Sequence, residues 1–368
     1  MIKLNVRFFN PIEATENVQR EYFEFFLTSF APNNEKLQEE LRKHIPSKYL
    51  WRGPYVSISP NFKQGQPFSE FEKDRIDEKV KKAFSNISKL YVHQEEAISR
   101  ILDGRNVIAA VPTGSGKTEI FMIPIIQYCY EHRGEPGVKA ILVYPMNALA
   151  KDQVDRLRKI LWILNDGLPD NEKITFAIYT GDTPENVKEL KKLEGISENC
   201  FLPNGERKKL GCPENCDKKQ IRYSVEEEIL YCPQNKNVKI SYQILTRKKI
   251  RDNPPDILIT NYVQLEHILT RKEDKRWLKK GSVKFLVLDE THTYTGSKGI
   301  DIAFLIRRLK ERIGESIICI GTSATLSSAH DEKERRRKIA NFATSIFGSQ
   351  FNVEDIIEAT FEPLKFPS

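Results

Sequence analysis

The sequence predicts an α/β protein built on a doubly wound parallel sheet. Short apolar segments alternate with helix-forming segments, polar residues follow the carboxyl end of each apolar segment, and a glycine-rich loop joins one such segment to a helix. In doubly wound sheets the strands are buried on both faces, and ligands bind outside the carboxyl ends of the strands. The observations therefore agree on one architecture.

Length and charge set broad limits on the kind of protein. The 368 residues carry 58 basic and 51 acidic side chains, which gives a net charge of +7. This length suits about two domains, and the mild positive excess permits a polyanionic partner without requiring one. No apolar run reaches the roughly 20 residues that span a bilayer, and the first residues lack a signal-peptide pattern. We expect a cytoplasmic protein with no membrane partner.

The amino-terminal part predicts a mostly helical accessory segment, residues 1–88. Between Gln19 and Phe30 apolar residues recur at helical spacing, and a second helix is expected from Asn34 to His44. Near Leu90 the composition changes, and the alternation of strands and helices begins.

The glycine-rich loop follows the apolar run from Asn106 to Ala110 and reads Val-Pro-Thr-Gly-Ser-Gly-Lys-Thr. Backbone N–H groups of such a loop, together with the start of the next helix, bind phosphate oxygens. We expect Lys117 to reach the β- and γ-phosphates of a bound triphosphate and the Thr118 hydroxyl to ligate Mg²⁺. The general pattern has glycine where this chain has Val111. The other residues expected to bind phosphate are Thr113, Gly114, Ser115 and Gly116.

Further apolar segments have the length of buried strands, and each is followed by polar residues. Because the carboxyl ends of parallel strands meet at one edge of a sheet, we expect the site to lie along that edge. These segments run from Lys139 to Pro145, Ile174 to Tyr179, Asp256 to Thr260, Lys284 to Leu288 and Ile317 to Ile320.

An acidic pair, Asp289 and Glu290, directly follows one of these strands. Two carboxylates in a fold that binds a triphosphate suit magnesium chemistry. Asp289 would hold Mg²⁺ opposite Thr118, and Glu290 would orient and deprotonate the attacking water. The sequence therefore predicts hydrolysis of a bound triphosphate.

The motifs and their order resemble those of the superfamily 2 helicases. The run from Asp289 to His292 is similar to their Asp-Glu-x-His motif, and Ser323-Ala324-Thr325 is similar to their third motif. The run from Asp289 to Gly296, followed by Ile306-Arg307-Arg308-Leu309, resembles the Lhr, YprA and MrfA group. The resemblance covers most of residues 90–330, and it implies a RecA-like motor lobe.

This resemblance implies roles for individual residues. His292, Ser323 and Thr325 would couple the state of ATP to domain movement. Gln94, placed some twenty residues before the loop lysine, would recognise adenine, and Tyr91 would stack on the ring. Residues after three other strands would hold the phosphate backbone of one nucleic-acid strand: Pro145, Asn147, Lys151, Gly181, Thr260 and Asn261.

The function implied is an ATP-dependent helicase or translocase, and the Lhr and MrfA group favours DNA as a single strand or a duplex with a single-stranded tail. An RNA helicase, a restriction-type translocase subunit, and a clamp or sensor that binds ATP and a strand without moving are the alternatives. Relatives of this type act in DNA repair or in anti-phage defence. Such motors use arginines of a second RecA-like lobe, which we expect from a longer chain or a partner protein.

The strand–helix alternation stops between about Pro184 and Arg251, in a segment rich in lysine, glutamate and asparagine. A metal site would order a segment with few apolar residues. Zinc in a tetrahedral site is the first prediction. A [4Fe–4S] cluster, which XPD-like helicases carry between their first and second ATPase motifs, and unligated thiols are the alternatives. The expected ligands are Cys200, Cys212, Cys216 and Cys232, whereas Cys129 and Cys319 lie in apolar segments and are expected in the core.

The predicted organisation is therefore an accessory segment, a motor lobe interrupted by an insertion, and a carboxyl-terminal segment that leads to a second lobe. The corresponding residues are 1–88, 89–183 for the first part of the lobe, 184–250 for the metal-binding insertion, 251–350 for the second part of the lobe, and 351–368.

Overall fold

The computed structural model describes residues 11–44, 60–145, 147–189, 222–224, 229–232, 235, 237–324 and 331–363. The chain forms two units, Met1–Pro60 and Asn61–Ser368. The predicted accessory segment extends to residue 88, so its last part falls within the second unit. Within the described ranges, none of the helices combines the length and the apolarity needed to cross a bilayer.

The first unit contains the two helices expected from the sequence, α1 (Pro11–Phe30) and α2 (Glu35–His44). They are joined by the Arg42 guanidinium, which donates to both carboxylate oxygens of Glu24, with Nη2 lying 2.7 Å from Oε2. Both side chains are largely exposed, so this ion pair contributes little to stability.

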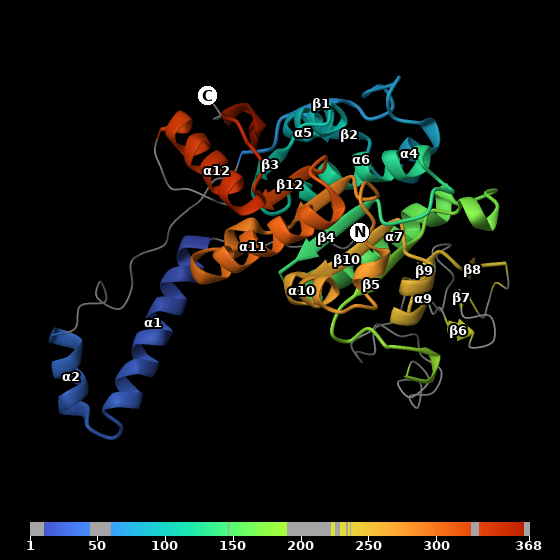
Figure 1. Cartoon of the computed structure of the whole chain (residues 1–368). Helices are drawn as coiled ribbons and strands as arrows, with labels where there is room; N and C mark the ends of the chain where they lie inside the picture. Colours follow the sequence, from blue (N-terminus) through green and yellow to red (C-terminus); the bar gives the residue numbers. More distant parts are fainter. Residues whose placement is uncertain are drawn as a thin grey trace, which may run out of the picture. The chain divides into compact units, whose positions relative to one another are not determined.

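The second unit is built on the predicted doubly wound sheet. In the described part of the chain this sheet has eight strands, all parallel, in the order β13-β3-β12-β11-β4-β10-β5-β9 (Figure 1). The chain crosses over neighbouring strands several times, which brings segments far apart in sequence to the same edge. The bounds are β3 Val107–Ala110, β4 Ala140–Tyr144, β5 Phe176–Tyr179, β9 Gln243–Ile244, β10 Ile257–Asn261, β11 Phe285–Leu288, β12 Ile318–Ser323 and β13 Ile356–Glu358.

Helices cover both faces of this sheet, and alternate residues of each strand face opposite ways. In β4, Leu142 packs in one apolar cluster with residues of α5, α6 and α7, whereas Ile141 and Val143 pack in a second cluster with residues of α10, α11 and α12. These strand residues are fully or almost fully buried. The bounds are α5 Val92–Leu102, α6 Lys117–Glu131, α7 Asn147–Leu164, α9 Arg247–Asp252, α10 Tyr262–Thr270, α11 Gly296–Ile313 and α12 Glu332–Phe347; short 3₁₀ turns lie at Asp170–Glu172, Lys275–Trp277, Thr291–Thr293 and Val353–Asp355.

The residues from 61 to 88 belong to the core of the second unit. They include β1 (Gln64–Pro67), which pairs antiparallel with β2 (Lys89–Tyr91), and α4 (Glu78–Ala83), whose first turn is capped by Asp77. Their apolar side chains are buried in the first cluster of the sheet, and this packing explains why the unit begins near residue 61. The buried residues are Phe68, Phe71, Ile76, Val80 and Phe84.

An antiparallel bridge joins the beginning of the second unit to its last described residues. Lys63 N donates to the Thr360 carbonyl at 2.8 Å, and Glu362 N donates to the Asn61 carbonyl at 2.8 Å. The rings of Phe62 and Phe361 stack with centroids 5.3 Å apart. The first residues of this unit and its last described residues are therefore neighbours.

The predicted insertion contributes both a small sheet and a strand of the main sheet. β6 (Arg222–Ser224), β7 (Ile229–Tyr231) and β8 (Lys239–Ile240) pair antiparallel, whereas β9 pairs with β5. Arg158 of α7 is only 1% exposed and donates through Nε and Nη2 to Gln243 Oε1 at 3.0 and 2.9 Å. The end of the predicted insertion is thus part of the main sheet.

Candidate active site

The carboxyl ends of β3 and β11 bring the glycine-rich loop and the acidic pair together. Lys117 is the first residue of α6, and Glu290 directly follows Asp289 at the end of β11. Lys117 Nζ donates to Glu290 Oε1 at 2.9 Å, and the two side chains are 11% and 23% exposed. The half-buried Thr118 is the second residue of the same helix. The structure therefore joins the two motifs that the sequence separates by more than 170 residues.

The backbone of the loop has the conformation that a phosphate cradle needs. Gly114 and Gly116 have φ angles of +80° and +76°, in the left-handed region that favours glycine. A Cβ on Gly116 would lie 2.1 Å from Gln94 Nε2. Buried Ser115 donates from Oγ to the Pro112 carbonyl at 2.7 Å, while Thr113 is exposed. The Ser115 hydrogen bond thus fixes the turn of the loop, and Thr113 and Gly114 lie exposed to solvent.

Val111 explains the departure from the general phosphate-loop pattern. Its side chain is fully buried, and its N–H donates to the Ser323 carbonyl of β12 at 3.0 Å. The position therefore continues the strand pairing and does not need the freedom of glycine.

The residues expected to bind the base adjoin the same loop. Gln94 Oε1 accepts from Tyr91 N at 2.8 Å, and its Nε2 donates to the Gly116 carbonyl at 2.9 Å. Next to it, Nε2 of the fully buried His93 lies 3.0 Å from the Ser115 carbonyl, and the Tyr91 ring stacks on the His93 ring. Burial lowers the pKa of His93, which favours the neutral ring. Adenine recognition by Gln94 and Tyr91 stays a prediction.

The second carboxylate, Asp289, is held by a residue that sequence reasoning missed. The Thr322 hydroxyl donates to Asp289 Oδ1 and accepts from Glu290 N at 3.2 Å. Burial raises the pKa of Asp289, and the nearby Glu290 charge adds to this effect, while Thr322 and Lys117 oppose it. A divalent cation bound there would favour the ionised carboxylate. Thr322 directly precedes the third motif, but only the strand register shows that it faces Asp289.

Glu290 itself has an unusual backbone. Its φ of +49° places a non-glycine residue in the left-handed region, directly after β11. Such a conformation costs of order 1–3 kcal/mol and persists where surrounding contacts fix it. Here those contacts are the hydrogen bond from Glu290 N to Thr322 and the hydrogen bonds that Thr293 donates to the Glu290 carbonyl.

The expected coupling residues lie between the acidic pair and β12. His292 Nδ1 lies 3.2 Å from Ser323 Oγ and 3.3 Å from Glu290 Oε2. Ser323 is fully buried as the last residue of β12. The histidine therefore links the carboxylate to that strand. Thr325, the third predicted member, lies outside the described residues.

The chemistry of this donor set fits a magnesium–triphosphate complex. It offers the Lys117 ammonium, the Thr118 hydroxyl and the carboxylates of Asp289 and Glu290, beside a loop whose two glycines have left-handed φ angles. Oxygen ligands suit Mg²⁺, and ammonium and amide groups suit phosphate. Thr118 and Asp289 are the residues that would hold the ion.

The predicted nucleic-acid residues lie at the ends of β4, β10 and β5, next to the acidic pair. Half-buried Pro145 follows β4, and Asn147 and Lys151 lie in the first turns of α7. Thr260 is fully buried, with its hydroxyl donating to the Tyr179 carbonyl at 2.7 Å. The Thr260 side chain thus supports the sheet and has no exposed surface in this structure.

Two further positions shape this edge. Asn261 Oδ1 accepts from Gln264 N at 2.8 Å and thereby caps α10. Exposed Gly181 lies in the turn after β5, and Arg247 Nη2 donates to the carbonyls of Thr180 and Gly181 at 2.9 and 3.2 Å. Arg247 was not among the predicted site residues. It opens a basic run, Arg-Lys-Lys, but its sequence position gave no sign that it reaches this turn.

The predicted cysteine site falls mainly outside the described residues. Cys200, Cys212 and Cys216 lie there, whereas Cys232 is buried in the first apolar cluster, and its N–H donates to the Val238 carbonyl at 3.0 Å. Among the residues that the structure describes, no three or more His, Cys, Asp or Glu side chains are grouped so that they could hold a metal ion. Cys129 and Cys319 are buried in the core, as expected.

Comparison with known proteins gives consistent matches. The DEAD/DEAH box helicase family matches residues 91–201 and 224–332. The Druantia protein DruE of Escherichia coli is 28% identical over 411 residues, which cover 89% of this chain and 22% of the relative. The ATP-dependent helicase hrq1 of Schizosaccharomyces pombe is 25% identical over 274 residues, covering 72% of this chain and 20% of the relative. The chain thus spans about a fifth of the length of these relatives.

Solved structures share the fold. The helicase MrfA bound to DNA and AMPPNP superimposes with a TM-score of 0.50 at 22% identity, covering 82% of this chain and 31% of that protein. The DEAD-box helicase Mss116 bound to single-stranded RNA and UDP-BeF gives a TM-score of 0.50 at 18% identity, covering 80% of this chain and 46% of that protein.

Proposed function

Because the chain belongs to the DEAD/DEAH box helicase family, we propose that it is the ATP-binding motor lobe of a helicase or translocase that acts on DNA. The observation that carries this proposal is the contact between Lys117 and Glu290 at the carboxyl edge of the sheet. It brings a phosphate loop next to a carboxylate suited to activate water, and ATP hydrolysis uses both groups.

In the proposed reaction, water attacks the γ-phosphate of ATP in line with the bond to the β-phosphate; the bond from the γ-phosphorus to the bridging oxygen breaks, so that ADP leaves and inorganic phosphate forms. Lys117 leaves Glu290 for the phosphates, which frees the carboxylate to orient the water and take its proton. A magnesium ion held by Thr118 and Asp289 would neutralise phosphate charge. His292, which contacts both Glu290 and Ser323, would transmit the change to β12.

The nucleic acid is proposed to lie along the ends of β4, β10 and β5. The resemblance of the motifs to the Lhr, YprA and MrfA group favours DNA over RNA. Contacts there would go to the phosphate backbone and give little sequence selectivity. A second RecA-like lobe, supplied by a longer chain or a partner, would add the arginines that complete catalysis. A metal site at the four cysteines, and a role in DNA repair or anti-phage defence, belong to the same proposal.

The test is ATP binding and hydrolysis by the 368-residue chain, with and without single-stranded DNA or RNA, beside Lys117→Ala and Glu290→Gln. We expect measurable ATP binding that Lys117→Ala abolishes, with turnover near background as long as no second lobe supplies its arginines. Absence of ATP binding by the unmodified chain would refute the motor assignment. If RNA stimulates hydrolysis or competes for binding more strongly than DNA, RNA would replace DNA as the proposed substrate.

A further inference from the structure

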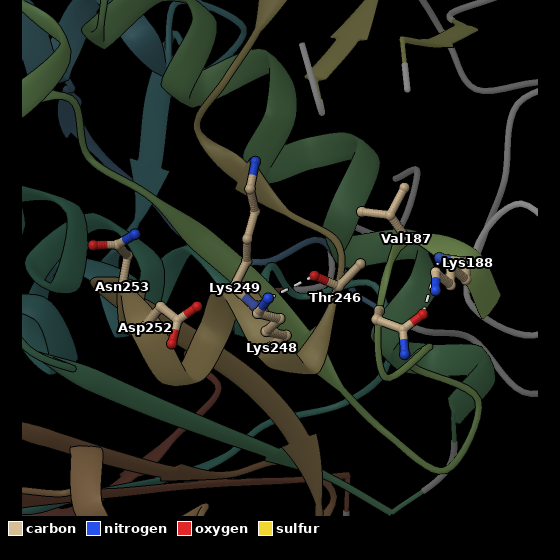
Figure 2. A pocket seen from close by; sticks show the side chains of 8 residues that line it. Val187, Lys188, Thr246, Lys248, Lys249, Asp252 and Asn253 are labelled. Carbon is tan, nitrogen blue, oxygen red and sulfur yellow. Dashed lines mark hydrogen bonds between the residues drawn. The ribbon is translucent and has the colours of Figure 1, made fainter. Parts of the chain in front are cut away.

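A basic cavity lies beside the turn after β5. Its volume is about 570 Å³, and its walls come from residues 186–188 and from α9 with its flanking residues. The charged side chains that line it are Lys188, Lys248, Lys249 and Asp252 (Figure 2). None of these residues belongs to the ATP site described above, and none was expected to bind a ligand.

The charges are unevenly placed. In Figure 2, Asp252 and Asn253 lie at one end of the cavity and Lys188 at the other, with Lys248 between them. Lys188 and Lys248 are exposed, and neither forms an ion pair with another described residue. The lining carries three lysines, of which Lys188 and Lys248 are exposed, and one carboxylate, and this excess of positive charge suits a polyanion.

Arg247 connects this cavity to the turn that is proposed to hold the nucleic acid. Its guanidinium donates to the carbonyls of Thr180 and Gly181 and lies over the Tyr179 ring, 5.2 Å from the centroid. The next residue along α9 is Lys248, whose N–H donates to the Glu185 carbonyl at 3.0 Å. The cavity and the turn are therefore fixed to each other by side-chain and backbone contacts.

The strand order explains why they share an edge. β9 runs parallel to β5, so α9, which follows β9, begins at the same carboxyl edge as the turn that follows β5. A strand that passes Gly181 along this edge would meet the lysines of the cavity next.

We propose that this lysine cavity binds the sugar–phosphate backbone of the DNA strand beyond its contact with the Thr180–Thr183 turn. The inference rests on the proposed function, since it extends the same nucleic-acid path. Lysine is a flexible point charge that binds phosphate without reading bases. Arg247 acts as a positioning residue, because its hydrogen bonds hold the turn and not the ligand.

The experiment measures binding of fluorescent single-stranded DNA by the full chain with an ATP analogue, as a function of salt. The variant carries Lys188→Gln, Lys248→Gln and Lys249→Gln. The matched control carries Lys79→Gln, Lys82→Gln and Lys89→Gln, which removes the same charge from exposed positions on α4 and β2. Thermal unfolding and binding of the ATP analogue verify that both variants are folded.

We expect the cavity variant to bind DNA about tenfold to a hundredfold more weakly at 0.1 M salt, and its slope of log affinity against log salt to fall by about 2, because each phosphate contact to a single strand contributes about 0.7. The control should stay within about twofold of the unmodified chain. Asp252→Asn, which removes the carboxylate, should strengthen binding.

The outcomes separate this inference from the proposed function. If the unmodified chain binds DNA and the cavity variant keeps its affinity and salt slope, the inference is wrong and the proposed function stands. If the control variant weakens DNA binding as much as the cavity variant does, binding depends on the overall positive charge and not on the cavity, and the inference is again wrong. If the unmodified chain binds ATP but no DNA, both are wrong.

Discussion

Replacement of Glu290 by glutamine should move ATP binding and ATP hydrolysis in opposite directions. In the structure Lys117 Nζ donates to Glu290 Oε1 at 2.9 Å, and neither side chain is more than 23% exposed. A triphosphate must therefore compete with this carboxylate for the lysine. Glutamine keeps the shape and a neutral acceptor, but it loses the charge.

The size of the effect follows from the strength of the two hydrogen bonds. A hydrogen bond that involves a charged group contributes about 1.5–3 kcal/mol. The bond between Lys117 and Glu290 has two charged partners and belongs at the upper end of this range, whereas the bond from Lys117 to a glutamine has one and belongs at the lower end. The difference of about 1–1.5 kcal/mol corresponds to roughly fivefold to tenfold tighter ATP binding. Loss of the general base should lower any measurable turnover by about 10²–10⁴.

The assay is titration with a fluorescent ATP analogue in the presence of Mg²⁺, together with phosphate release. Glu311→Gln, at an exposed position on α11, controls for the loss of one negative charge. Unchanged or weaker ATP binding by Glu290→Gln would show that the ion pair does not compete with the nucleotide, and the proposed release of Glu290 by Lys117 would then be refuted.

Three further predictions concern the loop and its supports. Gly116→Ala should abolish binding of the ATP analogue, because the residue has a φ of +76° and its Cβ would lie 2.1 Å from Gln94 Nε2. The urea concentration at the midpoint of unfolding should fall as the pH is lowered from 7 to 5, because the lowered pKa of His93 makes the unfolded chain bind a proton that the folded protein excludes. His93→Gln should make the midpoint depend less on pH, and the same dependence on pH in this variant would contradict the prediction. Arg158→Met should lower the free energy of unfolding by about 1–3 kcal/mol, because it leaves Gln243 Oε1 without its partner. The double variant with Gln243→Leu should recover part of that loss in urea unfolding, whereas strictly additive losses would exclude a coupling between the two residues.

The central strands were predictable because each is a short apolar run buried on both faces. β4 and β11 are the clearest cases, and every residue in them is buried. β9 and β13 were missed, since they have two and three residues and lie among polar sequence. Strands this short are stabilised by their neighbours in the sheet, so their own sequence carries little signal.

The ATP site was predictable to the extent that it depends on motifs. Lys117 and Glu290 were expected to act together, and the structure brings them into contact. The contacts of Thr322 and Arg247 could not be predicted, because they depend on which strands are neighbours and on the register between them. Burial of Thr260 has the same origin, since its hydroxyl bonds to the adjacent strand β5.

The bridge between Phe62 and Phe361 has a mechanical consequence. Tension applied to the chain on either side of the second unit would reach the hydrogen bonds of Asn61, Lys63, Thr360 and Glu362 before it reached the parallel sheet. These hydrogen bonds would break one after another, so that a low force would be enough to separate the two segments. The same proximity makes the unit suitable for circular permutation. A short linker could join Glu362 to Asn61, and new termini could be placed in an exposed turn.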